Sequence, residues 1–95
     1  MSYVRAVRFT DVDRERVEQL IARVNEADGP PEGVRTTGLQ VLVDDAQGTA
    51  VVLQAYETEQ DMRDAEAIFE AMDASLTPGS RASVDRCEVK VDLKA

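Results

Sequence analysis

Apolar residues recur along the chain at spacings that predict six secondary-structure elements. Residues 3–9 mix β-branched, aromatic and Arg side chains without a helical stripe and predict a strand. Asp13 is the predicted N-cap of a helix that reaches about Ala27 and ends at the Gly- and Pro-rich stretch 28–33. The apolar stripe of this helix consists of Val17, Leu20, Ile21 and Val24.

The second half of the chain predicts three strands and one more helix. Residues 34–44 and 49–57 alternate as two strands of a hairpin. Thr58, with Asp61 three positions later, resembles a capping box that opens a helix ending near Ser75. The last segment alternates most regularly, so we predict a strand whose apolar side lies under the helices. That apolar side consists of Cys87, Val89, Val91 and Leu93.

The order strand, helix, strand, strand, helix, strand predicts an α+β fold, the ferredoxin-like βαββαβ sandwich. In it a four-stranded antiparallel sheet carries both helices on one face. Ninety-five residues accommodate one core, so we expect a single domain over residues 1–95. The uncovered sheet face mixes apolar and polar side chains, as expected where a second copy covers it. We predict a homodimer whose interface includes Gln40, Leu42, Glu88 and Lys90; which face of residues 3–9 lies there stays open.

Composition narrows the chemistry that the chain can carry. Eleven Lys and Arg stand against 19 Asp and Glu, a net charge of −8, which disfavours nucleic acid and anionic membranes as partners. The longest apolar run, residues 50–53, is far too short to cross a bilayer. The chain has no His, no Trp and one Cys, which excludes His-based catalysis and an intrachain disulfide. We therefore expect a cytoplasmic protein without a metal or cofactor.

Four polar residues form the candidate ligand site. If the first strand lies between the third and fourth, Tyr56, Gln54 and Arg86 share one surface, and Tyr3 is added from the first strand. A phenol beside a guanidinium would bind a small acidic or phenolic ligand, and the Arg would lower the phenol pKa. The alternative is that these residues hydrogen-bond across a dimer interface.

Other polar clusters have ordinary structural interpretations. The carboxylates of Asp11, Asp13 and Glu15 fit helix capping better than a metal site. Asp44 and Asp45 fit a hairpin turn. The second predicted helix is strongly acidic, as a solvated face would be, and it places Glu66 and Glu70 as an unfavourable i, i+4 pair. The apolar residues Met62, Phe69 and Met72, together with Cys87, are predicted to pack in the core.

Three segments resemble the dimeric α/β barrel superfamily and its antibiotic-biosynthesis monooxygenase-like domains. These are residues 4–9 running through 10–13 into the first helix, residues 38–42, and residues 50–58. The resemblance implies two sheets packed face to face in a homodimer, with a pocket between the sheet and helices of each subunit. Catalytic branches of this superfamily use a His, or polar pocket residues such as Asn, Trp and Tyr, and of these only Tyr could match here, through Tyr3 or Tyr56. No catalytic residue is therefore carried over.

These observations predict a homodimeric module that is non-catalytic or binds a small ligand. One alternative is a cofactor-independent monooxygenase or isomerase acting on a small aromatic or polyketide-like compound. Another is an ACT-like domain that senses a small molecule, although the glycine-bearing turn of that domain is not matched by residues 10–13.

Overall fold

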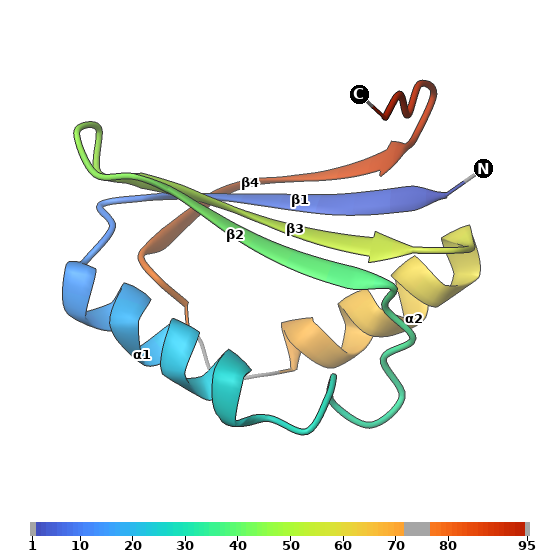
Figure 1. Ribbon diagram of the computed structural model, residues 1–95, viewed down its shortest axis with the longest axis horizontal. Coiled ribbons are helices and arrows are strands. Elements are labelled where there is room, and N and C mark those ends of the chain that lie inside the picture. Colours follow the sequence, from blue (N-terminus) through green and yellow to red (C-terminus); the bar gives the residue numbers. More distant parts are fainter. Residues whose placement is uncertain (1, 72–76, 95) are drawn as a thin grey trace.

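Six elements make up the computed structural model, which describes residues 2–71 and 77–94. Their order matches the predicted βαββαβ arrangement (Figure 1). The elements are β1 (Tyr3–Thr10), α1 (Arg14–Glu26), β2 (Gly38–Asp44), β3 (Thr49–Tyr56), α2 (Glu59–Glu70) and β4 (Ser80–Glu88).

The four strands form one antiparallel sheet in the order β2-β3-β1-β4. Figure 1 shows α1 and α2 on the same side of this sheet, which confirms the predicted ferredoxin-like fold. We call that side the helix-facing side and the other the open face. Among the residues described, no helix is long and apolar enough to cross a membrane.

Both predicted helix starts are confirmed. The Asp13 side chain accepts a hydrogen bond from the Glu15 backbone N–H at 2.8 Å, and α1 ends at Glu26 with Ala27 as its C-cap. The Thr58 hydroxyl accepts one from the Asp61 N–H at 3.0 Å. Each cap satisfies a donor that the first helical turn would otherwise leave unpaired. The α2 helix ends at Glu70, and the predicted end near Ser75, like Met72, lies outside the described residues.

Two apolar clusters form the core on the helix-facing side. The first consists of Val7, Phe9, Ala50 and Val52. The second consists of Val34, Tyr56, Met62 and Ala65. Strand register places a polar pair between them, because Arg5 lies opposite Gln54 while Val7 lies opposite Val52 and Tyr3 opposite Tyr56. The sheet therefore changes from apolar to polar and back along its strands.

The last strand differs from the prediction. It ends at Glu88, and the predicted core residues Val91 and Leu93 lie beyond it with 74% and 89% of their surface exposed. Pairing with β1 decides this end, because Tyr3 opposite Glu88 is the last pair of the ladder. Cys87 pairs with Val4, so it lies on the open face and is exposed, and its predicted place in the core is wrong.

The structure also reverses the predicted face of β4 and decides the face of β3. Gln54 and Tyr56 belong to the buried, helix-facing set of β3, and Arg86 lies opposite Arg5 on that same side. Both faces of β3 carry apolar residues, so sequence alternation alone does not choose between them. Of the four predicted interface residues, Gln40 and Leu42 lie on the open face, Glu88 lies on the helix-facing side, and Lys90 follows the end of β4.

Candidate functional site

A buried arginine on β1 is the centre of the polar layer between the two apolar clusters. Arg5 is 3% exposed, and every side of its guanidinium has a partner. Its Nε donates to Glu66 Oε2 at 3.1 Å and its Nη2 to Glu70 Oε1 at 3.0 Å. Its Nη1 donates to Gln54 Oε1 at 3.2 Å, and the ring centroid of Phe69 lies 6.0 Å away. These contacts compensate for the loss of water around a buried charge.

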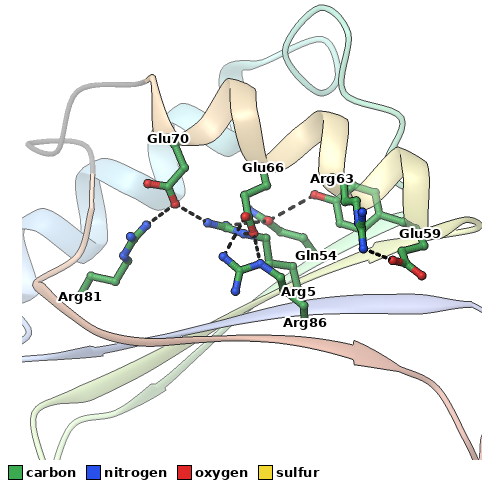
Figure 2. Close-up of polar contacts among 9 residues, drawn as sticks. Arg5, Gln54, Glu59, Arg63, Glu66, Glu70, Arg81 and Arg86 are labelled. Carbon is green, nitrogen blue, oxygen red and sulfur yellow. Dashed lines mark hydrogen bonds and ion pairs between the residues drawn. The ribbon is translucent and has the colours of Figure 1, made fainter.

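Two further arginines on β4 bind the same two glutamates. Arg86 forms a two-point contact with Glu66, through Nε at 2.6 Å and Nη2 at 2.7 Å. Arg81 pairs with Glu70. Figure 2 shows the three arginines rising from the sheet toward the two glutamates of α2. We call these five residues the arginine–glutamate cluster: Arg5, Arg81, Arg86, Glu66 and Glu70.

The cluster holds its carboxylates in the charged form. Hydrogen bonds from Arg86 lower the pKa of Glu66, and Arg5 acts in the same direction. The hydrogen bond from Arg81 lowers the pKa of Glu70. The pKa of Arg86 is raised in turn by its hydrogen bonds to Glu66. Opposite charges favour each other's ionised forms, so the glutamates and arginines of the cluster stay paired. These ion pairs connect α2 to β1 and β4.

Tyr56 is buried below the arginine–glutamate cluster. Its side chain is fully buried, and its hydroxyl donates to Gln54 Oε1 at 3.2 Å, the same oxygen that accepts from Arg5. Burial raises the pKa of Tyr56 and outweighs the opposing charge of Arg5. The predicted lowering of the phenol pKa by an arginine is therefore wrong, because desolvation disfavours the phenolate more than the cation favours it.

Tyr3, the predicted ligand residue on β1, lies apart from the arginine–glutamate cluster. Tyr3 Oη donates to Glu88 Oε2 at 3.5 Å, and the Glu88 charge raises the pKa of Tyr3. The structure thus brings Gln54 and Tyr56 into contact and connects Arg86 to them only through Glu66 and Arg5. Within residues 2–71 and 77–94, no group of three or more His, Cys, Asp or Glu side chains is arranged to hold a metal ion.

Sequence reasoning missed the central residues of this layer. Arg5 shares its strand face with Val7 and Phe9, so a charged residue within an apolar set was the available signal. The second signal was the repulsive i, i+4 pair of Glu66 and Glu70, which becomes favourable once cations lie between the two carboxylates.

The open face has an apolar centre and a polar margin. Its central side chains come from β1, β3 and β2, and most are only half-buried: Val4, Ala6, Val51, Leu53, Ala55 and Leu42. At the margin lie Arg8, Gln40, Ser83, Asp85 and Cys87. A shallow hollow at the β2–β3 hairpin includes Arg8, Leu42 and Asp44. This distribution is typical of a surface that contacts another protein.

No protein-family model matches the chain, and no curated protein matches it. A proposed antibiotic biosynthesis monooxygenase from Bacillus cereus aligns over 100% of this chain and 97% of its own, with a TM-score of 0.58 and 19% identity. An uncharacterized NIPSNAP-like domain protein from Burkholderia xenovorans aligns over 98% of this chain and 90% of its own, with a TM-score of 0.54 and 16% identity. The likeness confirms the predicted fold, and at this identity it extends to the fold alone.

Proposed function

We propose that the chain acts as a homodimeric small-ligand-binding module, with the open face of one copy packed against that of a second. The observation that carries this proposal is the apolar centre of the open face, formed by side chains such as Leu53 and Val51. Covering such a face removes apolar surface from water at about 25 cal/mol for each Å².

The helix-facing side supports a binding role more than a catalytic one. Tyr56 is buried and hydrogen-bonded, and its raised pKa keeps the phenol protonated near neutral pH. The guanidiniums of Arg81 and Arg86 are exposed at the rim of the cluster, where three arginines face two glutamates. A small acidic compound is the ligand class that this surplus positive charge favours.

Native mass spectrometry of the purified protein tests both parts of the proposal. The intact chain is expected to appear as a dimer, with any retained small molecule visible as added mass. Leu53→Glu places a charge at the centre of the open face and is expected to give monomers, because an unpaired charge in an apolar interface is strongly unfavourable. Gln19→Glu adds the same charge at an exposed position on α1 and is the matched control.

The outcomes separate the alternatives. A monomeric intact chain, or a Leu53→Glu variant that stays dimeric, would contradict dimerisation through the open face. Oxygen consumption with a polyphenolic substrate that is lost in Tyr56→Phe would replace the binding role with the predicted monooxygenase alternative. An acidic adduct that disappears on Arg86→Gln would locate the ligand at the rim of the cluster.

A further inference from the structure

Glu70 is held less firmly than the other glutamate of the arginine–glutamate cluster. Glu66 accepts hydrogen bonds from Arg5 and Arg86 through both carboxylate oxygens, and 21% of its side chain is exposed. Glu70 accepts from Arg5 and Arg81 through the same oxygen, Oε1, and 42% of its side chain is exposed. Solvent molecules therefore have access to the carboxylate that lies between these two guanidiniums.

The α2 helix itself disfavours a negative charge at this position. Glu70 is the last residue of α2, where the partial negative charge of the helix end repels a carboxylate. Glu66 lies one turn earlier and adds a like charge at the i, i+4 spacing. The last turn of α2 contains no basic residue that would offset these charges. The arginines of the sheet, and not the helix, therefore hold the Glu70 carboxylate in place.

Arg5 and Arg81 together form a site that suits a carboxylate. Arg5 is 3% exposed, and its hydrogen bonds to Glu66 and Gln54 fix the position of its guanidinium. The side chain of Arg81 is 46% exposed. Figure 2 shows the two arginines approaching the same oxygen of Glu70 from two sides. If Glu70 moved away, three arginines would face one glutamate, and an external carboxylate would restore the lost charge-assisted hydrogen bonds.

We propose that a small carboxylic acid binds in its ionised form between Arg5 and Arg81, in the place of Glu70, which acts as an internal competitor for the ligand. This inference rests on the proposed function, because it names the position at which the acidic ligand binds. Glu70 belongs to the same chain, so its effective concentration at the two arginines is on the order of millimolar or higher. The ligand therefore displaces Glu70 only when it is abundant or makes further contacts with the protein.

Titration of the full chain with sodium acetate at pH 7 and constant ionic strength tests this exchange. Nuclear magnetic resonance follows the side-chain Nε–H signals of Arg5 and Arg81 and the carboxyl carbon of Glu70. In the unchanged chain, all three signals are expected to shift with one dissociation constant, whereas chloride at the same ionic strength is expected to leave them unchanged. Glu70→Ala removes the competitor, so acetate is expected to bind at least about tenfold more tightly.

Three further variants control for charge, for the binding site and for folding. Asp64→Ala removes a carboxylate from an exposed position on α2, where it accepts from Gln60, and is expected to keep the acetate dissociation constant within about threefold of the unchanged chain. Arg81→Gln is expected to abolish the response of Arg5 to acetate. Glu70→Gln keeps the shape of the side chain, and its dissociation constant is expected to lie between those of the unchanged chain and Glu70→Ala.

Thermal melting gives a second readout of the same site. Glu70→Ala leaves Arg5 with one charged partner fewer, so its melting temperature in chloride is expected to be below that of the unchanged chain. Acetate in place of chloride is expected to raise the melting temperature of Glu70→Ala by about 3 °C or more beyond its effect on Asp64→Ala. An equal effect of acetate on the two variants would overturn the inference.

The results that overturn this inference differ from those that overturn the proposed function. Equal acetate dissociation constants in the unchanged chain and Glu70→Ala would exclude competition. A response of the arginines without a shift of the Glu70 carboxyl carbon would exclude displacement. An acidic adduct that is lost on Arg86→Gln but kept on Arg81→Gln would overturn the exchange and leave the proposed ligand binding intact. No retained acidic compound and no acetate response in any variant would overturn both proposals.

Discussion

Arg5 is a charge buried between the two apolar clusters of the core. Removing a guanidinium from water is unfavourable by several kcal/mol unless its partners are well placed, and Arg5 has two carboxylates and an amide oxygen. Glu66 and Glu70 also reach solvent, and each pairs with a second arginine on β4. Arg5 therefore depends on the two glutamates more than the glutamates depend on Arg5. Loss of a carboxylate leaves the buried Arg5 cation with one charged partner fewer. Loss of Arg5 leaves two carboxylates that still have arginine partners on β4.

This asymmetry predicts a specific acid sensitivity. The pKa values of Glu66 and Glu70 are lowered from 4.5, so their stabilising contribution is complete above that value and is lost as the pH falls through the lowered values. Glu66→Gln is expected to reduce the free energy of unfolding at pH 7 by about 2 kcal/mol and to flatten its decline in acid. Urea unfolding at a series of pH values measures both effects.

Arg5→Met provides the comparison for this prediction. It replaces the charge with an apolar side chain, so it is expected to destabilise the fold less than Glu66→Gln. Asp44 and Glu88 also have lowered pKa values, so some acid sensitivity is expected to remain in either variant. A Glu66→Gln profile that falls in acid as steeply as that of the unchanged chain would refute the role assigned to the cluster.

At the scale of elements, the two helices are attached to the sheet in different ways. The α2 helix buries Met62 and Ala65 and is tied to two strands by the arginine–glutamate cluster. The α1 helix buries Val17 alone among its apolar residues, while Ile21 and Val24 stay exposed. The polar layer therefore depends directly on the stability of α2. Fewer side chains attach α1 to the sheet.

The N-cap of α2 is testable by itself. Thr58→Ala removes the oxygen that accepts from the Asp61 N–H and is expected to lower the free energy of unfolding by about 1 kcal/mol. Thr58→Ser keeps that oxygen and is expected to stay close to the unchanged chain. Chemical denaturation of both variants gives the measurement, and equal losses in the two would show that the hydroxyl does not act as a cap.

For the whole molecule, charge opposes the assembly that the open face favours. Each copy carries a net charge of −8, so two copies repel each other at long range. Salt screens this repulsion, with a Debye length of about 30 Å at 0.01 M and about 8 Å at 0.15 M. We expect the dimer dissociation constant to fall as sodium chloride rises over that range, as measured by sedimentation.

Leu53→Glu serves as the reference for the salt experiment and is expected to stay monomeric at every concentration. A dissociation constant that rises with salt would contradict the prediction. It would indicate that attractive pairs across the interface, for example from Arg8 at the margin of the open face, outweigh the net repulsion.

Much of the fold was predictable because its signals are local. Asp13 and Thr58 cap their helices as predicted, since a capping side chain bonds to backbone only two or three residues away. The contacts of the candidate site are not local in this sense. Arg5 is 61 residues from Glu66 and 65 from Glu70, and no pattern within a short window relates them. The predicted meeting of Gln54 and Tyr56 was visible because they are two apart on one strand.

The sequence by itself determined the order of the elements, both helix starts and the ferredoxin-like fold, because hydrophobic period and caps act within a few residues. Only the tertiary structure decided which face of β3 the helices cover, since both faces are apolar enough for either choice. It also decided that β4 stops at Glu88, where the ladder with β1 ends at the pair Tyr3–Glu88. Cross-strand register, rather than sequence alternation, placed Arg86 on the helix-facing side of the sheet. It also left Val91 and Leu93 exposed to solvent.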